Sequence, residues 1–111
     1  MIALTYLQNG IESTRREKII RLLLESTSPL SVKDIAIFLG IDPRNSKLIY
    51  EDLMHIAKSV RRRHKGRNLL MLPPMCSNCG YIFKEMKRLK TPSRCPRCKS
   101  EQILPPRFII K

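Results

Sequence analysis

The segments Cys76-Ser-Asn-Cys79-Gly80 and Cys95-Pro-Arg-Cys98-Lys99 contain all four cysteines of the chain, in two C-x2-C pairs. Fifteen residues separate the pairs, a spacing typical of a four-cysteine zinc site. A two-residue gap lets a tight turn point both sulfurs at one ion, and the backbone amides of that turn stabilise the thiolates. Gly80 tolerates a left-handed backbone, and Pro96 favours the second turn. We therefore predict four metal ligands: Cys76, Cys79, Cys95 and Cys98.

Four cysteine ligands close the coordination shell of an ion and leave no position for a catalytic water. We therefore predict a structural ion, with Zn²⁺ as the first choice and iron, which thiolates also bind, as an alternative. Two disulfides are a further alternative, but they are rare in cytoplasmic chains, and the sequence shows no βαβ pattern for a redox-active C-x-x-C. A segment of about 37 residues is too short to fold on an apolar core alone, so the metal would supply folding energy.

Pro73-Pro74 separates this cysteine-containing region from an N-terminal region with helical periodicity. We predict an α+β chain with one domain at residues 1–74 and a second at residues 75–111. At the very start, Asn9-Gly10 suggests a turn.

Two helices are expected early in the first domain, at Thr14 and at Ser31, because each hydroxyl residue precedes an acidic residue by three positions. The second of these helices carries Phe38 near its end and should stop at Gly40. A third helix is expected from Pro43 to about Val60. Its apolar residues recur at spacings of three and four and should be buried: Ile49, Leu53, Ile56, Ala57 and Val60. Its opposite face is polar and available to a partner: Arg44, Lys47, Glu51, His55, Lys58 and Arg62.

Residues 61–68 form a polar, glycine-containing segment that leads into an apolar run at residues 69–72. This pattern predicts a β-hairpin, or wing, behind the third helix. In the second domain, short strands are expected at residues 81–83, 102–104 and 108–110, with prolines and a glycine between them.

The chain has 22 Lys and Arg against 9 Asp and Glu, which gives a formal net charge of +13. Four thiolates around a divalent ion would reduce this to about +11, which still attracts a polyanion. No acidic residue lies between Asp52 and Glu85, so much of the positive charge is local. No apolar run is long enough to span a membrane and the N-terminus lacks a signal-peptide pattern, so we expect a cytoplasmic protein.

Three stretches carry a resemblance to a known family: Pro29-Leu-Ser-Val-Lys-Asp-Ile-Ala36, His55-Ile-Ala-Lys-Ser-Val-Arg-Arg-Arg63 and Pro92-Ser-Arg-Cys-Pro-Arg-Cys-Lys-Ser100. The chain resembles small archaeal proteins, described as predicted transcriptional regulators, that join a winged helix-turn-helix domain to a rubredoxin-like zinc ribbon. The resemblance implies that fold for the two domains and implies metal binding by the same four cysteines. In architecture, the chain is also similar to the archaeal general transcription factor that combines a winged helix with a zinc ribbon.

The function predicted from these features is that of a DNA-binding transcriptional regulator. The third helix would enter the major groove of duplex DNA, and the basic segment behind it would contact the phosphates. Arg44 and Lys47 would lie nearest the bases. The predicted nucleic-acid-binding residues are Arg44, Lys47, Lys58, Arg61, Arg62, Arg63, Lys65 and Arg67. Glu51 and Asp52 oppose the hypothesis because they would repel phosphates, and Lys47 and Glu51 could form a solvated pair.

The alternative hypothesis is a protein–protein interaction module of the transcription or RNA-processing machinery. Leu48 and residues 108–110 would then contact the partner, although both could equally pack between the two domains. The sequence shows no paired carboxylates, no nucleophile with a base and no glycine-rich phosphate loop. We therefore predict neither an enzyme nor a protein with a small-molecule substrate.

Overall fold

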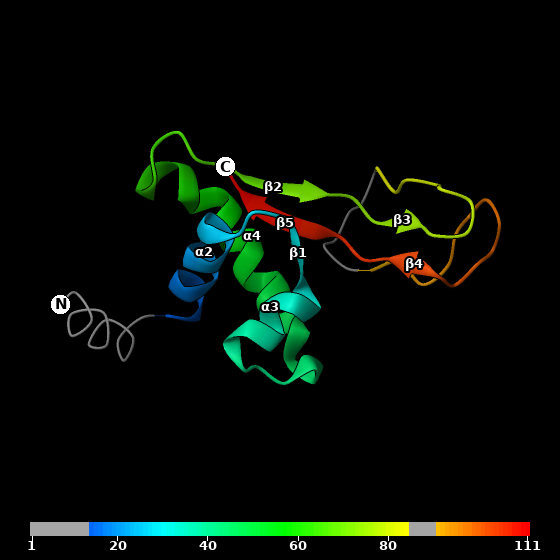
Figure 1. Ribbon diagram of the computed structural model, residues 1–111, viewed down its shortest axis with the longest axis horizontal. Coiled ribbons are helices and arrows are strands. Elements are labelled where there is room, and N and C mark those ends of the chain that lie inside the picture. The colour runs from blue at the N-terminus through cyan, green and yellow to red at the C-terminus, as the bar shows by residue number, and fades with distance from the viewer. Residues whose placement is uncertain (1–13, 85–90) are drawn as a thin grey trace.

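The computed structural model describes residues 14–84 and 91–111, so the turn predicted at Asn9-Gly10 lies outside the described residues. The helices of the described chain are α2 (Arg15–Glu25), α3 (Val32–Leu39) and α4 (Ser46–Arg63), with the 3-10 helix η1 (Pro43–Asn45) before α4. The strands are β1 (Leu30–Ser31), β2 (Leu69–Leu72), β3 (Met75–Cys76), β4 (Ile103–Leu104) and β5 (Arg107–Ile110) (Figure 1). In this part of the chain, no helix is both long and apolar enough to cross a membrane.

The helix starts follow from local hydrogen bonds. At α2, the Thr14 hydroxyl accepts a hydrogen bond from the Glu17 amide, which confirms the predicted cap. The reciprocal hydrogen bond, from the Thr14 amide to the Glu17 carboxylate, does not form. At α3 both halves form, because the Ser31 hydroxyl accepts from the Asp34 amide while the Asp34 carboxylate accepts from the Ser31 amide. Gly40 ends α3 in the left-handed conformation, at φ 69°, which a glycine adopts without steric cost.

The third predicted helix begins with one turn of 3-10 helix and continues as α4 to Arg63, three residues beyond the predicted end. Arginine is a good helix former, and cations are favoured at a helix C-terminus, so residues 61–63 extend the helix. The predicted strand β2 is confirmed. Its partner, however, is β5 near the C-terminus and not the preceding segment, so residues 61–72 do not form a hairpin on their own.

The last strand, β5, joins β1 and β2 in one sheet. β5 lies between β1 and β2 and is antiparallel to both, with Phe108 paired to Leu30 on one side and to Met71 on the other. The helices and this sheet form the helical part, residues 14–72 and 107–111. Residues 73–106, which we call the ribbon, leave the helical part after β2, and the chain returns to it at β5 (Figure 1). The strand predicted at residues 108–110 forms, but it completes the sheet of the helical part.

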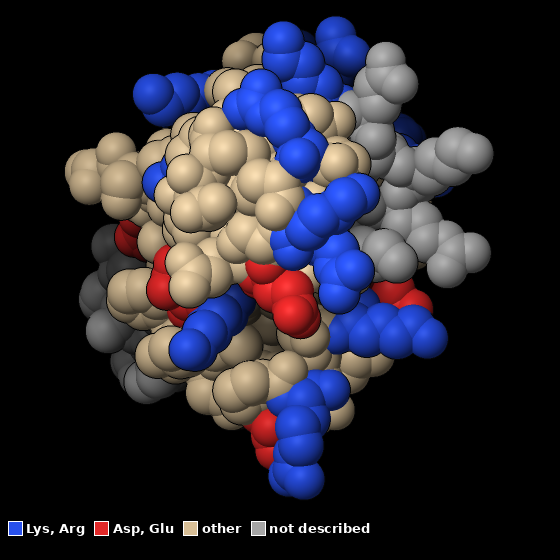
Figure 2. All heavy atoms as spheres, turned by 90° about the vertical axis from the view of Figure 1, so that its right-hand side faces the viewer, with Lys and Arg blue, Asp and Glu red and all other residues tan. Residues whose placement is uncertain are grey.

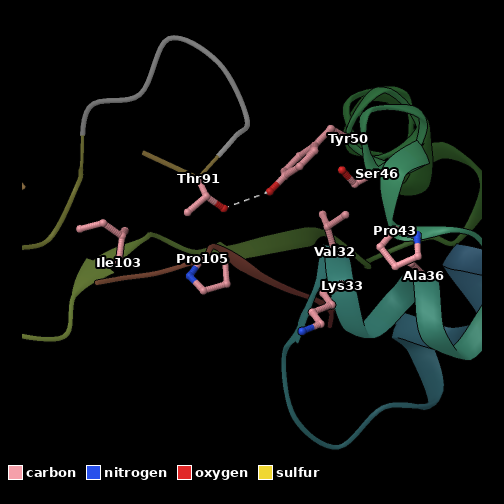
Figure 3. Close-up of a pocket in the computed structure, with 9 residues that line it drawn as sticks. All are labelled: Val32, Lys33, Ala36, Pro43, Ser46, Tyr50, Thr91, Ile103 and Pro105. Atoms are coloured by element: carbon pink, nitrogen blue, oxygen red, sulfur yellow. Dashed lines mark hydrogen bonds between the residues drawn. The ribbon is translucent and has the colours of Figure 1, made fainter. Parts of the chain in front are cut away.

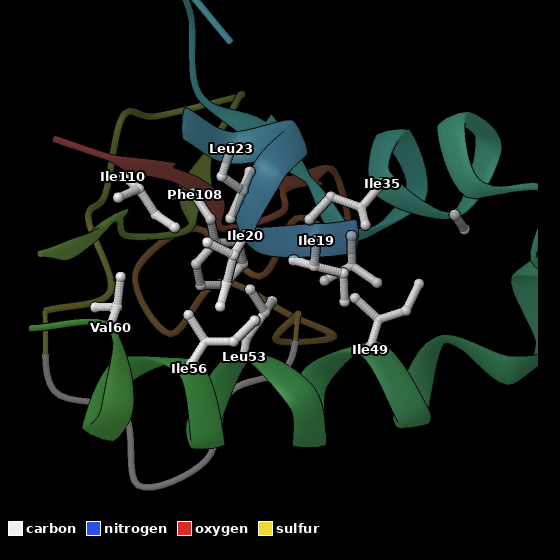
Figure 4. Packing of buried hydrophobic residues seen from close by; sticks show 12 residues of the cluster. Ile19, Ile20, Leu23, Ile35, Ile49, Leu53, Ile56, Val60, Phe108 and Ile110 are labelled. Carbon is white, nitrogen blue, oxygen red and sulfur yellow. The ribbon is translucent and has the colours of Figure 1, made fainter. Parts of the chain in front are cut away.

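The described residues form a hydrophobic core between helices α2, α3 and α4 and this sheet (Figure 4). Its buried members are Ile19, Ile20, Leu23, Val32, Ile35, Ala36, Ile49, Leu53, Ile56, Val60, Phe108 and Ile110. Ala57, predicted to be buried, is exposed, and Phe38 is 66% exposed. The eight-residue helix α3 buries only the face that carries Val32, Ile35 and Ala36, and Phe38 lies away from that face.

The cysteine-containing part projects from the helices along the long axis of the molecule, which measures 53 × 31 × 23 Å (Figure 1). Its regular structure is the two-stranded antiparallel sheet β3–β4, in which Met75 pairs with Leu104 and Cys76 with Ile103. The strand predicted at residues 81–83 is reduced to one bridge between Ile82 and Met75. The chain thus combines a mixed α/β part with a small four-cysteine ribbon.

Candidate functional site

The four predicted metal ligands converge at the far end of the ribbon. The sulfur atoms of Cys76, Cys79, Cys95 and Cys98 all lie within 4.8 Å of one another. The Cys76 and Cys98 sulfurs are 3.5 Å apart, and the Cys79 and Cys95 sulfurs are 3.6 Å apart. Tetrahedral Zn²⁺ with Zn–S bonds of about 2.3 Å places its sulfurs about 3.8 Å apart, whereas a disulfide requires about 2.05 Å. The donor set and its spacing therefore fit one metal ion, and the disulfide alternative does not fit.

Two turns of the same shape hold these cysteines. In each turn, the first cysteine carbonyl accepts a hydrogen bond from the residue four positions on, which is Gly80 in one turn and Lys99 in the other, at 2.9 Å in both cases. Both of these residues have a positive φ, 80° for Gly80 and 66° for Lys99. The glycine was anticipated from the sequence, whereas the left-handed lysine was not, because only a few per cent of non-glycine residues adopt this conformation.

Hydrogen bonds to sulfur favour the thiolate form that binds metal. The Asn78 side chain donates to the Cys98 sulfur at 3.5 Å. This hydrogen bond, together with one from the Ser100 backbone, lowers the pKa of Cys98 from 9.0 to about 6. The backbone amides of Arg97 and Cys98 donate to the Cys95 sulfur at 3.3 and 3.4 Å. Burial raises the pKa of Cys76. The donors near Cys98 and Cys95 therefore prepare the site for a cation, which would also compensate the buried Cys76.

Arg97 fastens the two turns to each other. Its guanidinium donates to the Cys79 carbonyl at 2.8 Å and lies over the Tyr81 ring, 5.8 Å from the ring centre. The Tyr81 ring in turn meets the Phe83 ring edge-on, with ring centres 5.0 Å apart. These contacts stiffen the ribbon next to the metal site.

The eight predicted nucleic-acid-binding residues are all exposed. Six of them lie together in sequence over the C-terminal half of α4 and the turn that follows it. We name this group the basic end: Lys58, Arg61, Arg62, Arg63, Lys65 and Arg67. None of these six forms an ion pair with another described residue.

The two remaining residues, Arg44 and Lys47, lie at the opposite end of this helical segment. Lys47 is in the first turn of α4, whereas Arg44 is in η1 and donates to the Asp42 carboxylate at 2.8 Å. This ion pair offsets part of the charge of Arg44 and holds its side chain along η1. Arg44, predicted to lie nearest the bases, would have to exchange Asp42 for a nucleic-acid partner.

Asp52 does not face the surface. Its side chain is 1% exposed and accepts hydrogen bonds from Arg15 and, at 3.0 Å, from Arg16. Burial alone would raise the pKa of Asp52, but the two guanidinium groups lower it by more, to below its ordinary value of 3.8. The negative charge of Asp52 is thus offset inside the fold, and Glu51 alone remains as an exposed carboxylate on α4.

Sequence reasoning missed Arg15 and Arg16 as partners of Asp52, which lie 37 and 36 positions away along the chain. A signal was available, because Asp52 follows Ile49 by three positions and precedes Ile56 by four, so it lies on the buried face of α4. A carboxylate on a buried face requires a cation or several donors.

Figure 2 views the molecule from its ribbon end. Lys and Arg side chains lie along the upper and right-hand parts of the surface seen there.

The apolar residues predicted as partner contacts differ in their exposure. Phe108, Ile109 and Ile110 are buried in the sheet, so they are not available to a partner, whereas Leu48 is 39% exposed. Sequence reasoning missed Ile37, which is 64% exposed beside Phe38 at the end of α3.

Two family models match the chain. Residues 14–70 match "PF0610-like, N-terminal", and residues 73–111 match "PF0610 rubredoxin-like zinc beta-ribbon domain". Among solved structures, the chain is similar to the solution NMR structure of protein PF0610 from Pyrococcus furiosus, with 45% sequence identity and a TM-score of 0.69. This similarity covers 89% of the present chain and 90% of that chain. A comparison with curated proteins found no match. The zinc-ribbon architecture predicted for the C-terminal part is thereby confirmed.

Proposed function

The chain belongs to the PF0610-like family, and we propose that it is a DNA-binding transcriptional regulator with a winged helix-turn-helix domain and a structural Zn²⁺. The observation that carries the proposal is the basic end, whose six exposed cations have no ion-pair partner among the described residues. Such a surface is typical of contact with a polyanion.

The order of the elements supports a winged helix. Helix, strand, helix, helix and two strands follow one another, and the last strand, β5, lies in the middle of the sheet. In a winged helix the loop between the last two strands forms the wing, and here the metal ribbon is inserted at that position. On this proposal, α4 is the helix that enters the major groove and the ribbon replaces a simple wing.

The distribution of charge along α4 indicates how DNA would be bound. In the first half of the helix, Glu51 balances Lys47, and Asp52 is already offset by the arginines of α2. On α4, the unbalanced charge lies at the basic end, where it would meet phosphates and not base edges. We therefore expect binding with a steep salt dependence and a modest preference for sequence.

Zinc is the proposed metal because four thiolates in a closed tetrahedral site suit Zn²⁺, which carries out no redox reaction there. Four thiolates also bind iron, and metal analysis of the purified protein distinguishes the two. On this proposal the protein is not an enzyme and acts in the cytoplasm, where its thiols stay reduced.

Fluorescence anisotropy with a labelled random-sequence duplex tests the proposal. Six phosphate contacts predict that log Kd rises with log salt with a slope of about 5. The triple variant Arg61→Gln, Arg62→Gln, Arg63→Gln should lower this slope by about 3. The matched control, Lys18→Gln, Lys84→Gln, Arg107→Gln, removes the same charge outside the basic end and should leave the slope nearly unchanged. Absence of binding at low salt, or equal slopes for the two triple variants, would refute the proposal.

Exposed apolar residues favour a second candidate, the protein-interaction module. Ile37 and Phe38 are exposed side by side at the end of α3, although side chains of this size are usually buried. Docking of a protein there would not depend on the basic end. The variant Ile37→Ser, Phe38→Ser should then lose a partner while it keeps its affinity for duplex DNA.

A further inference from the structure

A cavity of about 420 Å³ lies where the ribbon returns to the helical part. Val32, Lys33 and Ala36 of α3 line one side together with Pro43 and Ser46 from the start of the α4 region. Ile103 and Pro105 face them from the ribbon side (Figure 3). The volume is within the range of about 300–1,000 Å³ that is usual for small-molecule sites. The cavity is therefore large enough for a small organic ligand and joins the two parts of the molecule.

The lining is apolar with a few polar groups at its edges. Val32 and Ala36 are buried, and Pro43, Ile103 and Pro105 add further apolar surface. The polar groups are the Lys33 ammonium and the hydroxyls of Ser46, Tyr50 and Thr91. None of the lining residues within the described ranges is acidic. A molecule with an apolar body and one negative charge matches this combination in shape and charge.

The polar groups of the lining make few hydrogen bonds or ion pairs with other described residues. Lys33 forms no hydrogen bond or ion pair with any residue between 14 and 84 or between 91 and 111. The hydrogen bond between the Tyr50 and Thr91 hydroxyls spans the gap between α4 and the ribbon side, but at 3.5 Å it is long (Figure 3). O–H···O bonds are usually about 2.7–2.8 Å, so a ligand could exchange for this contact with little loss.

We propose that this cavity binds a small organic carboxylate with an apolar body, and that the bound carboxylate lowers the affinity of the protein for DNA. The carboxylate pairs with Lys33, and the apolar body packs between Val32, Ala36 and Ile103. Lys33 and the start of α4 line the same cavity, so the bound negative charge lowers the positive potential near the helix that we assign to the major groove and weakens its attraction for phosphates. The regulatory half of this proposal rests on the proposed function, whereas the binding half does not.

Binding is tested on the metal-loaded full chain by ¹H–¹⁵N and methyl NMR, with 3-phenylpropionate and octanoate as probes. Their amides, 3-phenylpropanamide and octanamide, are the neutral controls. We expect saturable shifts at Val32, Ala36 and Ile103, with binding of the carboxylates about fivefold tighter than that of the amides, as expected for one partly exposed ion pair. Shifts confined to the basic end, equal affinity for carboxylate and amide, or no saturable shift with either carboxylate would overturn the proposal.

The variant Lys33→Gln separates the ion pair from the apolar contacts. Lys33 is exposed on α3 and outside the core, so the variant should fold like the parent protein. It should bind the carboxylates no better than the amides. The matched variant Lys18→Gln removes the same charge from α2 and should keep the fivefold difference. Retention of the preference in Lys33→Gln would contradict the assigned role of Lys33.

The regulatory half is tested by repeating the duplex titration with saturating 3-phenylpropionate against sodium chloride of equal ionic strength. We expect the affinity for DNA to fall by about fivefold in the parent protein and to stay unchanged in Lys33→Gln. An unchanged affinity in the parent protein would overturn the regulatory half alone. If the carboxylate binds but the protein binds no DNA at all, the proposed function fails and the cavity remains a ligand site.

Discussion

The helical part of the molecule buries twelve residues in one core, whereas the described residues between 73 and 104 bury only Pro74, Cys76 and Cys95. The helical part is therefore stabilised mainly by the burial of apolar surface. The described residues of the ribbon form no comparable core, and the ribbon depends on the convergence of four thiolates on an ion. The two parts of one short chain thus fold for different physical reasons.

The two parts are nevertheless linked through β5. The chain leaves the helical part after β2, forms the ribbon and returns with Phe108 and Ile110, which enter the helical core. A folded ribbon holds the ends of β2 and β5 close together. An unfolded ribbon turns residues 73–106 into a flexible loop, whose closure costs about 3 kcal/mol. Metal binding at the far end should therefore stabilise the helical core indirectly.

Removal of the metal should give the largest effect. Structural Zn²⁺ sites contribute about 10 kcal/mol or more of binding free energy, so the ribbon should unfold in metal-free protein and in Cys95→Ser. The helical part should remain folded with a lower Tm. NMR chemical-shift dispersion measures this for each residue, and Ser93→Ala serves as the control. A ribbon with native dispersion in the absence of metal would contradict the account.

Truncation of Phe108 should destabilise the helical part and leave the metal site intact. Phe108 is buried at the centre of the sheet, so Phe108→Ala should lower the free energy of unfolding of the helical part by about 3–5 kcal/mol. The metal should stay bound, because the ligands lie at the other end of the molecule. Chemical denaturation and metal analysis measure the two effects. Phe83→Ala, in the ribbon, is the control and should cost less; an equal cost would show that the two parts are one cooperative unit.

Substitution of Asp52 should have an intermediate effect, and only on the stability of the helical part. Asp52→Asn should cost about 1–2 kcal/mol, since the arginines that it releases are partly exposed and can be solvated. The folded pKa of Asp52 is lower than its ordinary value of 3.8. The stability from this carboxylate is therefore present above that value and is lost as the pH falls below it through the folded pKa. The difference between parent and variant should be constant near neutral pH and shrink below pH 3.8; a difference that grows with acidity would exclude this role.

The two metal-binding turns have different residues at their left-handed position, Gly80 in one and Lys99 in the other, and this gives the smallest predicted effect. Lys99→Gly should stabilise the ribbon by about 0.5–1 kcal/mol because glycine adopts the left-handed conformation without strain. Gly80→Ala should destabilise it by about 1 kcal/mol for the same reason. Competition for metal against a chelator measures both changes. Changes of the same sign in the two variants would refute the equivalence of the turns.

The sequence predicted the features that depend on neighbouring residues. The cysteine spacing identified the metal site, Thr14 and Ser31 identified the starts of α2 and α3, and Gly40 identified the end of α3. Features that depend on distant pairing were not predicted. The strand at residues 108–110 was expected to belong with the ribbon, because nothing local shows that Phe108 pairs with Leu30 and Met71. The pairing of Asp52 with Arg15 and Arg16 was hidden for the same reason.

The most direct test of the account is a ¹H–¹⁵N NMR titration of the metal-loaded protein with a short duplex at low salt. The account predicts shifts at the basic end and along α4, which weaken together as salt is added, while the amides of the four cysteines stay near their starting positions. Shifts concentrated at the metal-binding turns, with none between Lys58 and Arg67, would contradict it.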